Sequence, residues 1–101
     1  GRVGVTVSLE EAQDAARCCT IHMLGAIKAY LGDLDKVMRF VKLQVYVSSK
    51  TGFSDQHIVA NAASQLLYDI FGESGKHVRT AIGVNQLPMD VPVEVEAIAE
   101  I

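Results

Sequence analysis

The sequence predicts an α+β fold in which two helices pack on one face of a mixed β-sheet. Two periodicities in the hydrophobic residues support this prediction, and they alternate along the chain. Apolar residues recur at helical spacing over residues 8–31 and 54–71. Apolar and polar residues alternate, as in strands buried on one face, over residues 37–47, 78–86 and 93–100. A chain of 101 residues is long enough for one hydrophobic core, so we expect a single domain.

Both ends of the first predicted helix carry capping signals. Ser8 is a favourable N-cap residue, and Glu11 three positions later completes a capping box. Gly32 is placed to end the helix, because glycine readily adopts the left-handed conformation common just after a helix. We therefore expect a helix from about Ser8 to Leu31. Its apolar face comprises Leu9, Ala12, Ala16, Cys19, Met23, Ala26, Ile27 and Tyr30.

The middle of the chain is predicted to form a strand followed by the second helix. Ser54 is a candidate N-cap, Phe53 and Ile58 occupy the positions of a hydrophobic staple, and Gly72 ends the apolar stripe. A strand–helix–strand unit joins parallel strands through a right-handed crossover, so we expect the first two strands to pair in parallel. In the first strand, the predicted helix-facing residues are Val41, Leu43, Val45 and Val47, and those facing the other way are Phe40, Lys42, Gln44 and Tyr46.

The last quarter of the chain carries the most informative pattern. Its two strands are predicted to pair as an antiparallel hairpin, with Pro88 and Pro92 in the connection, where neither removes a hydrogen bond from the sheet. Paired in this way, the apolar sets of both strands share one face. The other face is then predicted to carry three charges beside two small residues: Arg79, Glu94 and Glu96, with Ala81 and Gly83.

Two helices can cover only one face of this sheet. On the predicted pairing, the other face holds Phe40, Tyr46, Ala81, Gly83 and Ile98 as well as the charges. The mean hydropathy of +0.24 is also high for a small monomer. An apolar face of this kind is typical of a contact between subunits. We therefore expect the protein to assemble with copies of itself through this face.

Several classes of function are disfavoured by composition. The net charge is −3 and no run of Lys or Arg occurs, whereas nucleic-acid binding needs a basic surface. No apolar run is long enough to span a bilayer. Cys18 and Cys19 are adjacent and form no disulfide framework, which favours a reducing, cytoplasmic location. Cys18 and His22 could share a metal ion, but two ligands without a third do not predict a metal site.

A resemblance to a known family rests on the same last quarter. Arg79-Thr80-Ala81-Ile82-Gly83-Val84, then Leu87-Pro88, then Val93-Glu94-Val95-Glu96-Ala97 resembles the carboxy-terminal signature of the RidA-like family, also called YjgF-like or L-PSP endoribonuclease-like. Residues 41–47 are similar to the family's central strand. The resemblance implies a chorismate-mutase-like fold and a homotrimer with a ligand cleft at each subunit interface. It also implies that the single domain, residues 1–101, lacks the amino-terminal β-hairpin of the family, which would precede Gly1.

The resemblance also implies site residues and an activity. Arg79 matches the arginine that binds the substrate carboxylate, with Thr80 and Ala81 beside it in the substrate-binding segment. Glu94 matches the glutamate that positions or activates the attacking water. Ala81 departs from the cysteine that many members have. Without the resemblance, Arg79 reads more readily as an interfacial ion pair with Glu94 or Glu96.

The implied activity is hydrolysis of reactive enamine or imine intermediates, such as 2-aminoacrylate, to a keto acid and ammonia, without a cofactor or metal. The alternative is a non-catalytic homotrimer whose interfacial cleft binds a small carboxylate metabolite, which the alanine at position 81 favours. A third possibility is an endoribonuclease or translation inhibitor, and the acidic net charge disfavours it.

Overall fold

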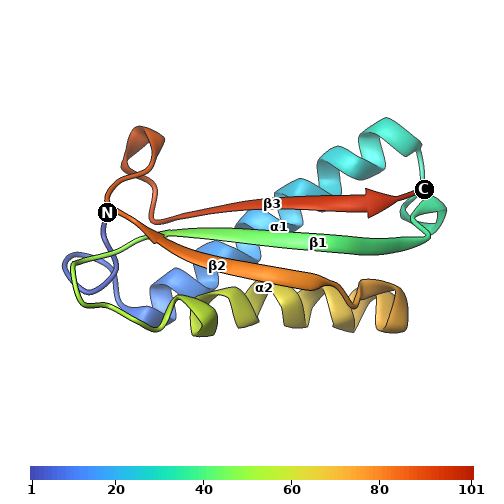
Figure 1. Cartoon of the computed structure of the whole chain (residues 1–101). Helices are drawn as coiled ribbons and strands as arrows, with labels where there is room; N and C mark the ends of the chain where they lie inside the picture. The colour runs from blue at the N-terminus through green and yellow to red at the C-terminus, as the bar shows by residue number, and fades with distance from the viewer.

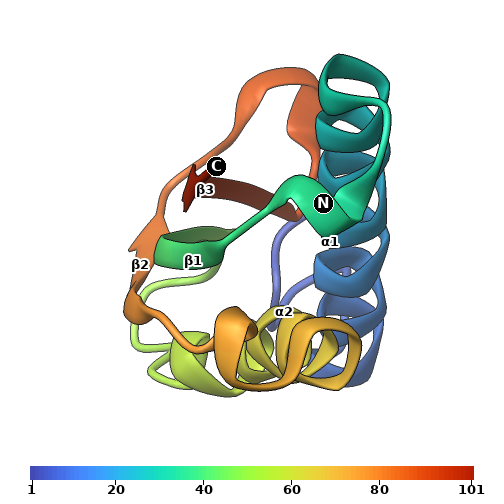
Figure 2. The ribbon, with the colours of Figure 1, turned by 90° about the vertical axis from the view of Figure 1, so that its right-hand side faces the viewer.

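The computed structural model describes all 101 residues and contains two long helices and three strands. In chain order, the helices and strands are α1 (Leu9–Leu31), β1 (Arg39–Ser48), α2 (Gln56–Phe71), β2 (Val78–Val84) and β3 (Val93–Glu100). Short 3-10 turns lie at Leu34–Lys36, Gly72–Gly75 and Pro88–Asp90. Both helices lie on the same side of the sheet (Figures 1 and 2). The predicted α+β architecture is therefore confirmed.

The capping signals place the helices as the sequence predicts at three of their four ends. The Ser8 hydroxyl accepts a hydrogen bond from the Glu11 backbone N–H, and the Glu11 carboxylate accepts one from the Ser8 N–H. These bonds hold the pKa of Glu11 below its usual value. Gly32 follows α1 with a φ of 87°, and α2 ends at Gly72. The start of α2 differs, because its N-cap is Asp55 rather than Ser54.

The strand order in the sheet is β2-β1-β3. The parallel pairing of β1 with β2 is confirmed, and β3 pairs with β1 in the antiparallel sense. The predicted hairpin between the last two strands is therefore wrong, since β1 lies between them. A turn with positive φ at Met89 and Asp90 lies in the connection, which leads past the end of β1. The central position suits β1 best, because its side chains Leu43, Val45 and Val47 are all fully buried.

The strand order changes which residues of β2 face the helices. In the register, Leu43 pairs with Arg79 and Val45 with Ala81, so Arg79, Ala81 and Gly83 share the helix face. Ala81 packs against the core, and a Cβ on Gly83 would lie 2.5 Å from the side-chain nitrogen of Gln56 on α2.

The apolar residues of β2 lie on the other, helix-free face of the sheet. Val78 is 67% exposed there and Ile82 is 40% exposed. The predicted facing of this strand was wrong. Because β2 is an edge strand, its helix face needs only small residues, together with one side chain long enough to reach α2.

Phe40 is a second correction to the predicted faces. A register shift between Phe40 and Lys42 turns the Phe40 side chain toward the helices, where it is 1% exposed. Its ring centroid lies 5.1 Å from that of Phe71 at the end of α2. A β-bulge of this kind offsets the alternation of a strand by one residue. The alternation of residues 37–47 therefore predicted the facing correctly only from Lys42 onward.

The core lies between the sheet and the helices and is closed by small residues on both helices. The buried residues include Ala12, Ala16, Ala60 and Ala63, so the helices approach the sheet and one another closely. Larger side chains fill the remainder, chiefly Phe40, Leu43, Val45, Val47, Val59 and Leu67. No helix is long and apolar enough to cross a membrane.

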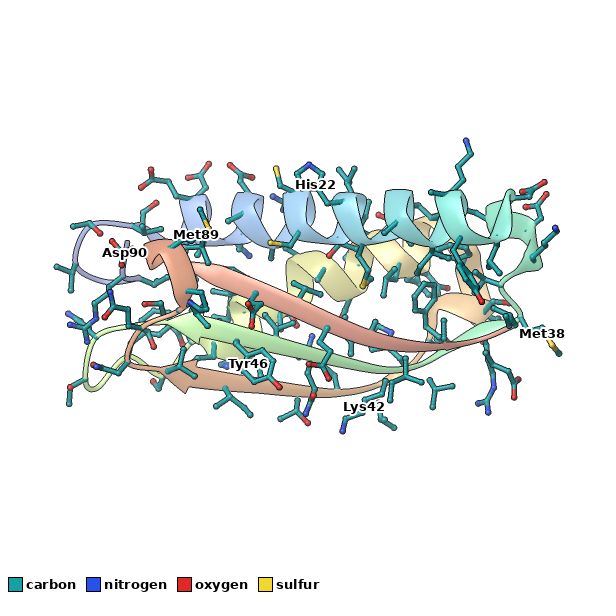
Figure 3. All side chains as sticks on the ribbon, turned by 90° about the horizontal axis from the view of Figure 1, so that it is seen from above. His22, Met38, Lys42, Tyr46, Met89 and Asp90 are labelled. Carbon is teal, nitrogen blue, oxygen red and sulfur yellow. The ribbon has the colours of Figure 1, made fainter.

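The helix-free face presents a mixture of apolar and charged side chains. Lys42 and Tyr46 on β1 point away from the helices, as Figure 3 shows. Glu94, Glu96 and Ile98 on β3 share that face, as their pairing with Tyr46, Gln44 and Lys42 requires. Ile98 is 55% exposed. The predicted placement of Tyr46 and Ile98 on this face is therefore confirmed.

Candidate functional site

Arg79 lies on the edge strand β2 and reaches across to α2. Its Nη1 donates to Asn61 Oδ1 at 2.7 Å and to Ser64 Oγ at 3.2 Å. Asn61 and Ser64 are three residues apart on α2, a spacing that places both side chains on one face of a helix. The side chain is therefore held in place by two neutral partners, which leave its positive charge uncompensated.

The rest of the guanidinium is available to a ligand. Arg79 Nε and Nη2 make no hydrogen bond within the chain, and Arg79 takes part in no salt bridge. Because Nη1 is already committed, the free donors are those along the Nε–Nη2 edge. Two parallel N–H groups on this edge match the two oxygens of a carboxylate. Arg79 thus presents a preformed side-on site for one carboxylate.

His77 extends this network beyond Arg79. Its Nδ1 lies 2.6 Å from the Gly75 carbonyl oxygen, and its Nε2 lies 2.9 Å from Ser64 Oγ. His77 lies one residue before β2, and Ser64 joins its side chain to that of Arg79. Neither Asn61 nor Ser64 was predicted as a site residue from the sequence. In the sequence both are polar residues beside the apolar stripe of the second helix, and any solvent-facing residue of a helix has that property.

Glu94 and Glu96 are not brought together with Arg79 in one protomer. Both glutamates are exposed on the helix-free face of β3, whereas Arg79 lies on the helix face of β2. The central strand β1 separates the two edge strands. The predicted group of three charges on one sheet face is therefore wrong for a single copy of the chain. For the same reason, no ion pair between Arg79 and either glutamate forms within the protomer.

The two remaining predicted binding residues point to opposite faces. Thr80 pairs with Gln44 and is exposed on the helix-free face, whereas Ala81 is half-buried against the core. A ligand held on the free edge of Arg79 would therefore meet the helix-face side of this segment, not the Thr80 hydroxyl. Ala81 offers it only a methyl group.

The cysteines and histidines outside this network form no metal centre. No group of three His, Cys, Asp or Glu side chains is close enough to hold a metal ion. Cys18 is exposed, and His22 points away from the sheet (Figure 3). Cys19 donates weakly to the Val93 carbonyl, with a sulfur–oxygen distance of 3.6 Å. Burial, with smaller contributions from Cys18 and Glu94, raises the pKa of the Cys19 thiol and keeps it protonated.

Two cavities of about 470 Å³ each lie beside these elements. One is a polar groove between α1 and α2, lined by Gln13, Arg17, Asn61, Ala62, Ser64, Gln65 and Tyr68. Asn61 and Ser64, the partners of Arg79, thus also line this groove. The other is an apolar groove between the second half of α1 and the edge strand β3.

Comparison with known proteins places the chain in a family. The sequence profile of the family described as Endoribonuclease L-PSP matches residues 1–101. The chain belongs to this family. It is the family also known as YjgF or RidA, so the resemblance drawn from the last quarter of the sequence is confirmed.

The chain is also similar to individual proteins over its whole length. The chain is 46% identical to Protein TCP17 of Trypanosoma cruzi, and the match covers 100% of this chain and 64% of that protein. A protein of unknown function from Agrobacterium tumefaciens, Atu1372, has a TM-score of 0.98 at 44% identity, covering 100% of this chain and 65% of that one. A Shewanella oneidensis MR-1 structure described as a "putative endoribonuclease" has a TM-score of 0.96 at 25% identity, covering 100% and 67% respectively. The chain thus spans about two thirds of the length of these relatives.

Proposed function

We propose that the protein is a homotrimeric enamine/imine deaminase that converts 2-aminoacrylate-type intermediates to a keto acid and ammonia. Family membership supports the proposal, and the single observation that carries it is the arrangement around Arg79. Its Nη1 is fixed by Asn61 and Ser64, while its Nε–Nη2 edge remains free for a substrate carboxylate.

The separation of Arg79 from Glu94 supports an active site shared between protomers. The two side chains lie on opposite faces of the sheet and on different edge strands. If both act on one substrate, Arg79 of one protomer must meet Glu94 of a neighbour. This requirement makes the assembly part of the chemistry, because a monomer would hold only half of the site.

The helix-free face supplies the surface for such an assembly. Val78, Ile82 and Ile98 are 67%, 40% and 55% exposed on it, and they come from both edge strands. Exposed apolar side chains gathered on one face are typical of a surface that another subunit covers. Three copies arranged about one axis would bury this face at the centre of the trimer and place the sheet edges at the subunit boundaries.

Each proposed residue has a defined task in the reaction. Arg79 binds the substrate carboxylate and so fixes the imine carbon relative to Glu94. Glu94 accepts a proton from water as the water oxygen bonds to that carbon. Glu94 passes this proton to the imine nitrogen, which gives a carbinolamine. The hydroxyl of the carbinolamine then gives its proton to the nitrogen as the carbon–nitrogen bond breaks, so that ammonia leaves and the carbonyl of the keto acid forms. An enamine such as 2-aminoacrylate reaches the imine beforehand by moving a proton from its nitrogen to its terminal carbon. No cofactor or metal is needed, because the imine carbon is itself the electrophile.

A mixing experiment tests both the activity and the shared site. Ammonia release from 2-aminoacrylate generated in situ is measured for wild type, Arg79→Ala and Glu94→Gln. We expect each variant alone to be inactive or nearly so. When the two are unfolded together and refolded at equal amounts, random assembly should restore about one quarter of the wild-type sites. Activity in wild type without any recovery in the mixture would place the two residues in the same protomer and contradict the shared site.

The runner-up function is a trimer that binds a small carboxylate without turning it over. Ala81 favours it, since a methyl group against the core offers no hydrogen bond to water or substrate. Binding of a 2-keto acid without any ammonia release in the wild type would select this function. Nuclease activity has the family description in its favour, but the chain carries 12 acidic and 9 basic residues. A cytoplasmic location completes the proposal, because both cysteines are free thiols.

A further inference from the structure

The direction of every hydrogen bond around Ser64 follows from the partners. The Gly75 carbonyl can only accept, so the imidazole proton of His77 lies on Nδ1, which is 2.6 Å away. In the neutral ring Nε2 is then an acceptor, and the Ser64 hydroxyl 2.9 Å away donates to it. Arg79 Nη1 can only donate, so at 3.2 Å it gives a hydrogen bond to Ser64 Oγ. The Ser64 proton therefore points at a base, and its oxygen faces a cation.

This arrangement has the parts of an activated nucleophile. A serine within hydrogen-bond reach of a histidine, whose other ring nitrogen is oriented by a third group, is the signature of nucleophilic catalysis. Here the orienting group is the Gly75 carbonyl instead of a carboxylate. Ser64 Oγ has two lone pairs and uses one for Arg79, which leaves the other for attack. The guanidinium also stabilises negative charge as it develops on that oxygen.

Asn61 supplies the donor that an acyl-transfer site needs. Its Oδ1 accepts from Arg79 at 2.7 Å, which fixes the orientation of the amide, and its Nδ2 makes no hydrogen bond within the chain. Side-chain amides in this role stabilise the oxyanion of a tetrahedral intermediate. Asn61 and Ser64 both line the polar groove between α1 and α2, which has a volume of about 470 Å³.

We propose that Ser64 is a nucleophile activated by His77, and that it cleaves small esters whose acyl group carries a free carboxylate. The free Nε–Nη2 edge of Arg79 would hold that carboxylate. Ser64 Oγ bonds to the ester carbon while its proton moves to His77 Nε2, and Asn61 donates to the oxyanion. The bond to the leaving alcohol then breaks, and the alcohol takes the proton from His77. Water next adds to the acyl-serine, gives its proton to His77, and releases the acid, while Ser64 regains the proton.

Covalent labelling with a fluorophosphonate tests the nucleophile without any assumption about imine chemistry. In this reaction Ser64 Oγ bonds to phosphorus and fluoride leaves. We expect one adduct per chain, located on Ser64 by peptide mass spectrometry and absent from Ser64→Ala. His77→Gln retains a hydrogen-bonding group but not the base, so the labelling rate should fall roughly 10²–10⁴-fold. Ser54→Ala, at an exposed serine outside the network, should label like wild type.

A pair of matched esters tests the substrate class. Hydrolysis of 4-nitrophenyl hemisuccinate should exceed that of the neutral 4-nitrophenyl butyrate, and Arg79→Lys should remove this preference. Wild type labelling no faster than Ser64→Ala, or His77→Gln labelling as fast as wild type with an unchanged circular-dichroism spectrum, would overturn the proposal. Labelling needs only the Ser64 network, so its failure would leave the deaminase proposal standing, and loss of ammonia release would leave labelling unaffected.

Discussion

Replacing Arg79 by lysine separates the binding function of this side chain from its charge. Arginine serves two sets of partners at once, Asn61 and Ser64 through Nη1 and a ligand through the Nε–Nη2 edge. Lysine has a single nitrogen, which cannot do both. It would retain the positive charge but lose the paired, charge-assisted hydrogen bonds to the carboxylate.

The size of this loss follows from the bonds removed. A hydrogen bond to a charged group contributes about 1.5–3 kcal/mol, which corresponds to a roughly 10- to 150-fold weaker Kd for a small 2-keto acid. Because Arg79 is exposed and has neutral partners, the free energy of unfolding should change by about 1 kcal/mol or less. Titration calorimetry measures the first quantity and urea unfolding the second.

A matched control is available at Arg39→Lys. Arg39 is also an exposed strand arginine, but its Nε is paired with Glu100 at 3.1 Å. We expect no change in 2-keto acid affinity there. If Arg79→Lys instead unfolded the protein, and the wild type bound no small carboxylate, Arg79 would be a structural residue and its free edge would not be a binding site.

Three further predictions concern stability and assembly. Phe40→Ala should lower the free energy of unfolding by about 3–5 kcal/mol, whereas Tyr30→Ala, at a site 85% exposed, should change it by less than about 0.5 kcal/mol in the same urea titration. Ile98→Glu should dissociate the proposed trimer in sedimentation equilibrium, and Ile21→Glu should not, although both isoleucines are 55% exposed; a trimer that survives Ile98→Glu would exclude the helix-free face as the interface. Ser8→Ala should cost about 1 kcal/mol at neutral pH. The capping glutamate has a lowered pKa, so its contribution is present at neutral pH and lost as the pH falls below the usual 4.5; thermal unfolding should show a difference between variant and wild type that narrows in acid.

The sequence predicted the helices well because their signals are local. The capping box at Ser8 and the glycine at position 32 lie next to the structure they define, and both act as expected. The strands were predicted as elements, and the parallel pairing of β1 with β2 and the facing of β3 were predicted correctly, but the strand order and the facing of β2 were wrong. Pairing depends on which distant segment lies alongside, and the alternation in β2 is equally consistent with either face toward the core. The bulge near Phe40 also turned that side chain toward the helices, which the alternation of the strand could not predict.

The residues of the candidate site could also be predicted only in part from the sequence. Arg79 and Glu94 were found through a signature in the sequence, whereas Asn61 and Ser64 became visible only when α2 was placed over β2. Asn61 and Ser64 belong to the site because they lie within hydrogen-bond distance of Arg79. An asparagine and a serine on a helix form no sequence pattern that would predict this contact. The hairpin predicted between the last two strands would have placed Arg79 and Glu94 on one face of the sheet, and the position of β1 between those strands prevents this.

Arg79 and Glu94 lie on opposite faces of the sheet, and this separation supports the proposed assembly more strongly than a shared face would have done. Had Arg79 and Glu94 faced each other within the chain, they would have formed an ion pair that needs no partner. Instead, Arg79 retains a free donor edge on one side of the sheet, and Glu94 is exposed on the other. The proposed trimer would account together for the exposed carboxylate of Glu94, the unpaired guanidinium edge of Arg79 and the apolar residues on the helix-free face. On this proposal, the activity depends on assembly, so a variant that abolishes the trimer, such as Ile98→Glu, should also abolish ammonia release.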